Sequence, residues 1–236
     1  GGASGIGAAL VAGFAAQGAR VAFVDLVDGT ALADELGQTA PRPLPLVADV
    51  TDPAALSAAI DTAEAGHGPL DVLVNNAADD QRCDPAELTP GEWDTLMAVN
   101  LDQVFFASQR AARSMRGRGG RIVNFSSVAH ILGLGELAPY TAAKGAITAL
   151  TRSLARAWGA DGVRVNAILP GMVLTEKQIR LRITPEFRED MLARQSLKRT
   201  IAPEDIVGPT LFLASEASAM VTGQSLIVDA GVVGGP

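Results

Sequence analysis

Short apolar runs alternate along the chain with segments of helical periodicity. Residues 6–17 show the spacing of an amphipathic helix that ends at Gly18, and residues 21–24 form an apolar run typical of a buried strand. The same alternation predicts strands at 46–48, 71–74, 122–125, 163–168 and 226–228, helices at 28–37, 53–65, 92–116, 138–158 and from Pro203 onward, and a loop at 128–137. Because strands that alternate with helices form βαβ units, we predict the α/β fold class. It has a doubly wound parallel sheet between two helical layers, in a single domain over residues 1–236.

A glycine-rich turn opens the chain and runs directly into the first predicted helix. Turns of this kind normally follow a strand, so we expect a further strand of about six to ten residues before Gly1. The spacing Gly1-x3-Gly5-x-Gly7 suits a tight turn that brings backbone amides close to a pyrophosphate at a helix N-terminus. The sequence therefore predicts a dinucleotide cofactor.

Asp25 ends the next strand, 18 residues after Gly7. A carboxylate at this position can bind the ribose hydroxyls of adenosine and repel a 2′-phosphate. Since the glycine turn contains no Arg or Lys, we expect NAD rather than NADP as the cofactor. The alternative is that Asp25 only closes a turn at the end of its strand.

Composition and charge exclude several classes of protein. With 48% hydrophobic and 19% charged residues, the chain can bury a substantial core and is not intrinsically disordered. A net charge of −7 disfavours unspecific nucleic-acid binding. The single cysteine, Cys83, and two histidines predict no metal site and no disulfide within the chain. No apolar run reaches the roughly 18 residues of a membrane span, and no leader is recognised, so we expect a cytoplasmic protein.

Tyr140 and Lys144 form the strongest candidate for catalysis. Their i, i+4 spacing places them on one face of the helix predicted at 138–158, and Tyr140 is the only tyrosine. A free phenol has a pKa near 10, and a neighbouring ammonium favours the phenolate and lowers that pKa. Ser127 follows the strand at 122–125, at an edge of the sheet where ligands bind. Ser126 is the alternative to Ser127.

These motifs resemble the short-chain dehydrogenase/reductase family over the whole length of the chain. The matching pieces, in chain order, are Gly1-x3-Gly5-x-Gly7, Asp49-Val50, Asn75-Asn76-Ala77, Asn100, Ser127, Tyr140-x3-Lys144 and Pro170-Gly171-x3-Thr175. The resemblance implies a three-layer α/β/α Rossmann fold. One departure is Ala78, where the family usually has glycine, and its methyl group is expected to narrow the cofactor pocket.

The resemblance also implies residue roles. Tyr140 would be the general base or acid, Ser127 would hold the substrate oxygen, and Asn100 would hold a water in a proton relay. Lys144 would bind the nicotinamide ribose and tune Tyr140. Asp49 and Val50 would contact adenine, Asn75 the ribose region on the adenosine side, and Thr175 the carboxamide. The expected cofactor-binding set is Gly1, Ser4, Gly5, Ile6, Gly7, Asp25, Asp49, Val50, Asn75, Ala77, Tyr140, Lys144, Pro170, Gly171, Val173 and Thr175. Asn100 and Asn75 could instead serve only to bond backbone or form turns.

Polar residues around the expected cleft suggest a substrate with several hydroxyls, because buried hydroxyls need hydrogen-bond partners. The candidates are Asp79, Gln81, His130 and Glu136, which could also be solvated residues at the rim. Residues 75–82, 184–186, 195–199 and 228–231 resemble the NAD-dependent sugar 1-dehydrogenases of the family, which oxidise an aldose at C1 to a lactone. A 3-oxoacyl thioester reductase, another secondary-alcohol dehydrogenase and a catalytically idle NAD-binding sensor remain alternatives.

Two expectations concern larger features. Residues 172–200 are too charged for the core and join elements at the carboxyl edge of the sheet, so we expect a mobile substrate lid with short helices. The alternative is a rigid pair of surface helices. Small residues on the helices at 92–116 and 138–158 suit close packing between subunits, and the family resemblance implies a homo-oligomer, with a tetramer expected.

Overall fold

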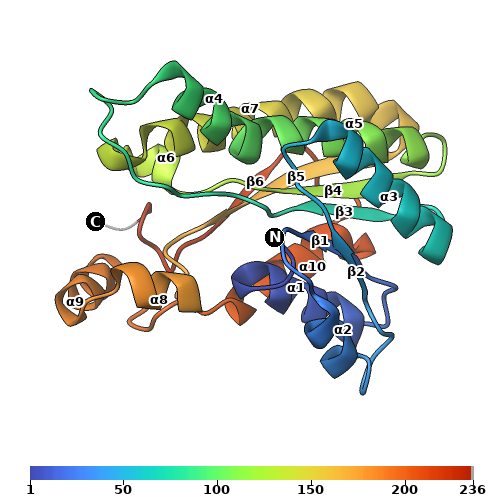
Figure 1. Cartoon of the computed structure of the whole chain (residues 1–236), viewed down its shortest axis with the longest axis horizontal. Helices are drawn as coiled ribbons and strands as arrows, with labels where there is room; N and C mark the ends of the chain where they lie inside the picture. Colours follow the sequence, from blue (N-terminus) through green and yellow to red (C-terminus); the bar gives the residue numbers. More distant parts are fainter. Residues whose placement is uncertain (235–236) are drawn as a thin grey trace.

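The computed structural model describes residues 1–234, and within them all side chains except those of residues 181 and 182. Helices cover both faces of a layer of parallel strands, so the predicted α/β class is confirmed (Figure 1). The strands are β1 (Ala22–Asp25), β2 (Leu44–Val47), β3 (Val72–Asn75), β4 (Gly120–Phe125), β5 (Val163–Pro170) and β6 (Ser225–Val228).

The two helical layers lie on opposite faces of the strands. Figure 1 shows α3 (Pro53–His67), α5 (Gln103–Met115) and α7 (Ala138–Trp158) on one face, and α1 (Gly5–Ala16), α2 (Thr30–Leu36) and α10 (Glu204–Ala214) on the other. Local chemistry fixes the helix starts. The Asp52 carboxylate accepts hydrogen bonds from the N–H groups of Ala54 and Ala55, with Pro53 in the first turn. Short 3-10 segments, η3 (Gly159–Asp161) and η4 (Glu216–Ser218), follow α7 and α10.

The core lies on both faces of β4 and β5, whose burial is nearly complete. On one face, Val123 and Ile168 pack with Ile206 of α10. On the other, Val165 packs with Met115 of α5. Apolar side chains on both faces are typical of a parallel strand that helices cover on two sides, which explains why these strands read as continuous apolar runs.

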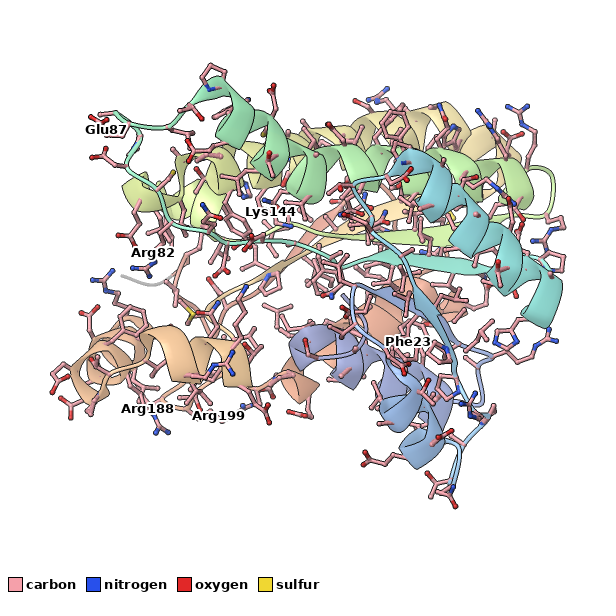
Figure 2. All side chains as sticks on the ribbon, viewed as in Figure 1. Phe23, Arg82, Glu87, Lys144, Arg188 and Arg199 are labelled. Atoms are coloured by element: carbon pink, nitrogen blue, oxygen red, sulfur yellow. The ribbon has the colours of Figure 1, made fainter. Side chains whose placement is uncertain are left out.

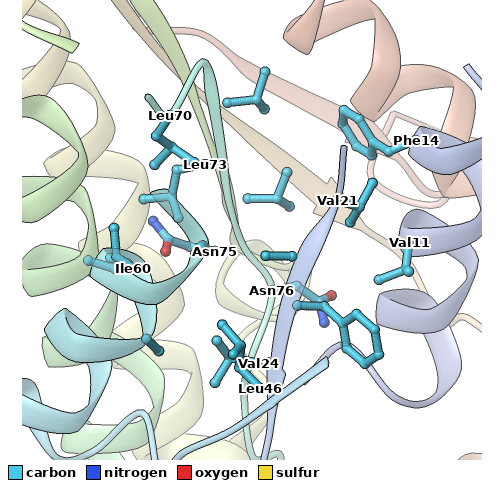
Figure 3. Close-up of a pocket in the computed structure, with 18 of the residues that line it drawn as sticks. Val11, Phe14, Val21, Val24, Leu46, Ile60, Leu70, Leu73, Asn75 and Asn76 are labelled. Carbon is cyan, nitrogen blue, oxygen red and sulfur yellow. The ribbon is translucent and has the colours of Figure 1, made fainter. Parts of the chain in front are cut away.

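The described strands form two sheets, whereas the sequence predicts one continuous sheet. β1 pairs with β2, and β3, β4, β5 and β6 pair in that order, all in parallel. Between the facing edges of β1 and β3 lies an apolar cavity of about 370 Å³ (Figure 3). Val21 and Val24 line it from one edge, and Leu73 lines it from the other. A strand between β1 and β3 would join the two sheets, and the strand expected before Gly1 lies outside the described residues.

The prediction of one continuous helix over residues 92–116 is wrong. The structure has α4 (Pro90–Met97), a π-helical turn η1 (Ala98–Asp102), and then α5. A π turn inserts one extra residue and widens the helix locally, and such turns are frequent at functional sites. Asn100, within this turn, forms hydrogen bonds to Asp79 in the loop after β3.

The loop predicted at 128–137 also contains helical structure. Its first part forms α6 (Ala129–Leu132), and its second part forms a 3-10 turn, η2 (Gly135–Leu137). The Ser127 hydroxyl accepts a hydrogen bond from the Ala129 N–H, and Gly133, with φ of 65°, ends α6 in the left-handed region. Ser127, which bonds the Ala129 N–H from just before the N-cap Val128, and Gly133 were therefore signals for a short helix.

Residues 172–200 fold into two short helices, α8 (Glu176–Arg182) and α9 (Pro185–Arg194), which stand apart from the main layers (Figure 1). The segment is closed at its base by a bridge between Val173 and Ile201. Arg188 and Arg199 lie on this outer part of the molecule, whereas Lys144 lies in the interior (Figure 2). The predicted short helices are present, and the mobility of the lid stays a prediction.

Candidate active site

The glycine turn leaves no room for side chains at two positions. A Cβ at Gly7 would overlap the carbonyl oxygen of Gly1, and a Cβ at Gly1 would lie 2.9 Å from the Cα of Ala77, just after β3. Gly5 has φ of 52°, and a Cβ there would lie 3.0 Å from Thr175 Cγ2. The turn therefore lies between the ends of β1 and β3, because the Gly2 N–H donates to the Val24 carbonyl and Gly1 lies against Ala77; Thr175 covers it at Gly5.

The first turn of α1 has free hydrogen-bonding capacity. Ser4 occupies the N-cap position, but its side chain makes no capping hydrogen bond. Backbone N–H groups at the start of a helix point outward and carry a partial positive charge, which favours an anion. Ile6 packs against the core behind this turn and fixes its position. The residues present fit the diphosphate of a dinucleotide.

Asp25 lies at the carboxyl end of β1 and is held by the backbone around it. Its carboxylate accepts hydrogen bonds from the N–H groups of Ala3 at 2.9 Å and Leu26 at 2.7 Å. Burial alone would raise the pKa of Asp25, but hydrogen bonds from the backbone N–H groups of Ala3, Val27 and Leu26 favour the carboxylate, and the pKa is lowered. Asp25 is therefore a fixed negative charge beside the glycine turn.

Lys144 is a buried cation beside Tyr140. The lysine is 2% exposed, its Nζ lies 5.3 Å from the centroid of the Tyr140 ring, and it donates a 2.8 Å hydrogen bond to the carbonyl of Phe125 at the end of β4. Burial lowers the pKa of Lys144 to about 7. The i, i+4 spacing on α7 thus brings these two side chains together at the carboxyl end of the sheet.

The two serines after β4 have different surroundings. Ser126 is 3% exposed, and its hydroxyl bonds the carbonyl of Lys144 at 2.7 Å and the hydroxyl of Thr148 at 3.2 Å. Ser127 is only partly buried, and its hydroxyl accepts from Ala129 N–H at 3.1 Å, which leaves its proton available for another acceptor. This difference favours Ser127 over Ser126 as the residue that contacts substrate.

Asn100 is completely buried within the π turn and bonds a neighbouring loop. Its Oδ1 accepts from Asp79 N–H at 3.0 Å, and its Nδ2 donates to Asp79 O at 2.8 Å and to Leu96 O at 2.9 Å. The side chain therefore fixes the loop after β3. Both N–H groups of the amide are used in these bonds, so the amide has no donor left for a water.

Asn75 differs from its expected place in the cofactor site. Its Nδ2 donates to Ser108 and to Asn124, within a buried polar network that continues from Asn124 to Thr151. The side chain that reaches the glycine turn belongs to Asn76, whose Nδ2 donates to Gly1 O at 2.8 Å. Successive side chains of a strand point to opposite faces, so the two asparagines divide between the core and the cofactor side.

The other expected adenine contacts lie after β2. Asp49 is exposed, and its carboxylate accepts from the N–H and hydroxyl of Thr51; these hydrogen bonds lower the pKa of Asp49. Val50 packs partly against the cluster that includes Leu56 and Ile60. Both residues follow β2 at the same carboxyl edge as Asp25.

The end of β5 forms the last part of the expected cofactor site. Pro170 is the last residue of β5, and Gly171 allows a close approach, because a Cβ there would lie 2.9 Å from the Cα of Asp229. Val173 is buried, and the Thr175 hydroxyl accepts from Gln178 N–H as the N-cap of α8. Thr175 thus joins the glycine turn to the lid.

The four expected substrate residues do not share one environment. Glu136 pairs with Arg82 at 2.9 Å, both largely exposed, and Gln81 is exposed beside them. His130 contacts Ser127 O through Nδ1 at 2.6 Å, which fixes its ring near Ser127. Asp79 lies within ion-pair distance of Lys177 on the lid. The structure therefore brings Asp79 to the lid and His130 to the serine, and leaves the other two at the rim.

Comparisons with known proteins establish the family. Residues 1–233 match the sequence model of a family described as enoyl-(acyl carrier protein) reductase. A short-chain dehydrogenase/reductase mutant from Serratia marcescens has a TM-score of 0.91 and 35% identity, covering 99% of this chain and 95% of that chain. The chain belongs to the short-chain dehydrogenase/reductase family. Several relatives of this short-chain dehydrogenase/reductase are named as dehydrogenases of sugars.

A protein of Rhizobium meliloti named "Probable galactose dehydrogenase" is 50% identical, over 98% of this chain and 92% of that protein. D-xylose 1-dehydrogenase of Caulobacter vibrioides is 43% identical, with 98% and 92% covered. A gluconate 5-dehydrogenase from Burkholderia cenocepacia, solved in complex with NADP and tartrate, has a TM-score of 0.93 and 36% identity, covering 100% of this chain and 94% of that chain. This short-chain dehydrogenase/reductase is accordingly an oxidoreductase that acts on CH–OH groups with a nicotinamide cofactor.

Within residues 1–234, no helix combines the length and the apolar character needed to cross a membrane. The same part of the chain holds no group of three or more His, Cys, Asp or Glu side chains arranged for a metal ion.

Three residues of this short-chain dehydrogenase/reductase were missed by sequence reasoning. Asn76 reaches the glycine turn, and Lys177 and Gln178 reach from the lid to the loop after β3. Lys177 and Gln178 follow the N-cap Thr175, so a capping pattern could have predicted that they belong to the first turn of a helix. Their partners, 98 residues away for Gln178 and Asp80, could not have been predicted from the pattern.

Proposed function

We propose that the protein is an NAD-dependent sugar dehydrogenase that oxidises an aldose at C1 to an aldonolactone. The proposal rests on one observation: the chain has the serine, tyrosine and lysine that this chemistry needs, and its relatives include enzymes that act on sugars. Ser127, Tyr140 and Lys144 lie at one edge of the sheet, and two relatives at 50% and 43% identity are named as a probable galactose dehydrogenase and a D-xylose 1-dehydrogenase.

Tyr140 is proposed to take the proton of the C1 hydroxyl. A positive charge on Lys144, 5.3 Å from the ring centroid, favours the phenolate that this step needs. The Ser127 hydroxyl holds the same substrate oxygen by donating a hydrogen bond to it. A nicotinamide cofactor held at the glycine turn and Asp25 would supply the hydride acceptor for C1. Proton transfer by a positioned side chain is typically worth about 10²–10⁴-fold in rate.

The preference for NAD is proposed from Asp25. Its fixed carboxylate beside the glycine turn suits the two hydroxyls of an unmodified adenosine ribose and repels a 2′-phosphate. The Burkholderia gluconate 5-dehydrogenase binds NADP, so this preference is a property to be measured on this chain.

Association and location complete the proposal. We infer a homo-oligomer, with a tetramer expected, that acts in the cytoplasm on a free small-molecule sugar. The small residues that suggested close subunit packing are mostly buried within the chain itself, including Ala107, Ala111 and Ala143. Exposed apolar side chains on α4, α5 and β6 support association instead.

A spectrophotometric screen tests the function. Purified protein is assayed for NADH formation with D-galactose, D-xylose, other aldoses, polyols and simple secondary alcohols, with NAD and NADP in parallel. We expect turnover of aldoses with NAD, and lactone detection by hydroxylamine identifies C1 as the oxidised carbon. Tyr140→Phe is the control, and we expect it to lose at least about 100-fold in kcat while NAD still binds.

The same screen addresses the rival enzyme. The matched family description names an acyl carrier protein reductase, so oxidation of NADPH by a 3-oxoacyl or enoyl thioester is measured as well. Thioester reduction without aldose oxidation would overturn the sugar proposal. NAD binding without turnover of any substrate would favour a non-catalytic sensor.

A further inference from the structure

The lid helix α8 contacts the loop after β3, beside the candidate active site. Gln178 Nε2 donates a 2.7 Å hydrogen bond to Asp80 Oδ2. Lys177 Nζ lies 3.7 Å from Asp79 Oδ1 and 3.6 Å from Asp80 Oδ1. Two adjacent residues of the lid thus meet two adjacent residues of the loop.

The hydrogen bond is the stronger part of this contact. The Lys177 side chain is 53% exposed and the Asp79 side chain 43%, so their attraction is largely screened by water. The Asp80 side chain is only 22% exposed, and a short hydrogen bond to a carboxylate is charge-assisted. Asp80 and Gln178 therefore determine most of the strength of the contact.

The loop side of the contact is rigid. Asn100, completely buried in the π turn, makes a two-point hydrogen bond with the backbone N–H and C=O of Asp79. Asp79 and Asp80 are therefore connected to the lid by their side chains and to the π turn η1 by the Asp79 backbone.

The lid side depends on outside contacts. α8 has seven residues, which is too short for a stable helix in water without tertiary support. At its start, Thr175 contacts the glycine turn at Gly5, and in its first turn Gln178 contacts Asp80. Loss of the Asp80 contact leaves the first turn of α8 with one fewer support beside the site.

We propose that Asp80 and Gln178 are a positioning pair that holds the lid closed over the substrate, on an anchor that Asn100 makes rigid. The inference rests on the proposed dehydrogenase function, because it assigns the closed lid to substrate retention. The acidic residues after β3 then serve the lid rather than the sugar. The apparent Kd for substrate equals the intrinsic Kd divided by the fraction of molecules whose lid is closed, whereas the chemistry in a closed molecule is unchanged.

Asp80→Ala and Gln178→Ala test the pair. We expect each to raise KM for the sugar about tenfold, the scale of a lost hydrogen bond to a charged group, with kcat changed by less than about threefold. The backbone amides of α8 should exchange with deuterium several-fold faster in both variants with NADH bound. The double variant should be no worse than Asp80→Ala alone, because Asp80→Ala already removes the hydrogen bond that Gln178→Ala removes.

Matched controls separate the pair from general surface effects. Glu87→Ala removes an exposed acid from the same loop, and Arg180→Met removes an exposed base from the same helix. Both should keep the wild-type KM and exchange rates. Gln178→Lys, which restores a donor to Asp80, should recover a large part of the lost affinity. Asn100→Asp should accelerate exchange in α8 as well, which a role confined to proton transfer would not do.

Gln178 lies on the lid, outside the core, so Gln178→Ala should fold even if Asp80→Ala does not. An unchanged KM and an unchanged exchange rate in Gln178→Ala would overturn the proposal. Additive effects of the two single variants would also overturn it. The exchange measurement does not require turnover. Faster exchange in a protein that oxidises no sugar would therefore retain the positioning pair and reject the proposed function.

Discussion

Lys144 shows at the scale of one residue how activity and stability compete. The sequence predicted that Lys144 and Tyr140 share a helix face, since their spacing alone determines it. It could not predict that the ammonium also bonds the Phe125 carbonyl, because that partner comes from a strand 19 residues earlier. Complete burial lowers the pKa of Lys144 to about 7, so the charged form is costly in the folded protein.

Replacing Lys144 with Met should stabilise the cofactor-free protein while abolishing turnover. The pKa of Lys144 is about 7 when folded and about 10.4 when unfolded, so the unfolded chain binds the extra proton between these values. The loss of folding stability caused by burying Lys144 is complete below pH 7 and disappears as the pH rises towards 10.4. Tm measured from pH 6 to 10 should therefore show the largest gain for Lys144→Met near pH 6, at about 2–4 °C for each kcal/mol removed. A gain that grows with pH would contradict the assignment.

Asp25 is expected to control cofactor choice through a single carboxylate. Its hydrogen bonds from Ala3 and Leu26 hold the charge in place, so Asp25→Ala removes both ribose recognition and repulsion of a 2′-phosphate. We expect Kd for NADH to rise about tenfold, as for a lost charge-assisted hydrogen bond, and the NAD to NADP ratio of kcat/KM to fall. Asp28→Ala, which removes an exposed acid three residues later, is the control and should leave the ratio unchanged.

At the scale of elements, sequence periodicity predicted regular structure well and missed elements set by long-range contacts. The helix predicted at 138–158 has those bounds in the structure, because its apolar face and its end at Gly159 are local features. The π turn within 92–116 depends on Asn100 bonding Asp79, which no local pattern contains. Likewise, Asn75 was placed at the cofactor and Asn76 was not, although strand alternation sends Asn75 into the core and Asn76 to the glycine turn.

The glycine turn gives an element-scale prediction. A Cβ at Gly7 would overlap Gly1 O, so Gly7→Ala must push apart the turn and the start of α1. We expect cofactor affinity to fall at least about tenfold, because the backbone amides no longer converge on the diphosphate. Equilibrium binding of NADH, followed by its fluorescence, measures the change.

Gly91→Ala is the matched control for this substitution. Gly91 lies in α4, a Cβ there has nothing within 4 Å, and alanine is the better helix former by about 0.5–1 kcal/mol. This variant should bind NADH normally and be at least as stable as the wild type. Normal NADH binding by Gly7→Ala would show that the turn does not hold the cofactor.

At the scale of the whole molecule, the parallel arrangement of the strands was predictable, and their order in the sheets was not. The βαβ alternation predicts parallel strands with a shared carboxyl edge, and the glycine turn, Asp25, Ser127 and Thr175 all lie at that edge. The apolar cavity lies between the two described sheets, where a strand would join β1 to β3, and core residues line it on both sides. The candidate site nevertheless forms across this division, since Gly1 and Ala77 come from its two sides.

The surface of the molecule carries two groups of exposed apolar side chains that a second copy would cover. On α4 and α5, Trp93 is 39% and Phe106 41% exposed. On β6, Leu226 is 37% and Ile227 41% exposed, although adjacent strand residues point to opposite faces. β6 is an edge strand of the four-stranded sheet, and an exposed apolar edge is a template for pairing with another strand.

We therefore expect light scattering to show a homo-oligomer at micromolar concentration, with a tetramer if both groups are used. Ile227→Lys and Phe106→Glu each place a charge in one group, so each should reduce the mass to a smaller assembly, and together they should give a monomer. Leu197→Lys is the control, because Leu197 is 62% exposed but belongs to neither group, and its mass should stay that of the wild type. A wild-type protein that is monomeric at micromolar concentration would reject the oligomer. A tetramer that survives both charges would place its interfaces on other surfaces.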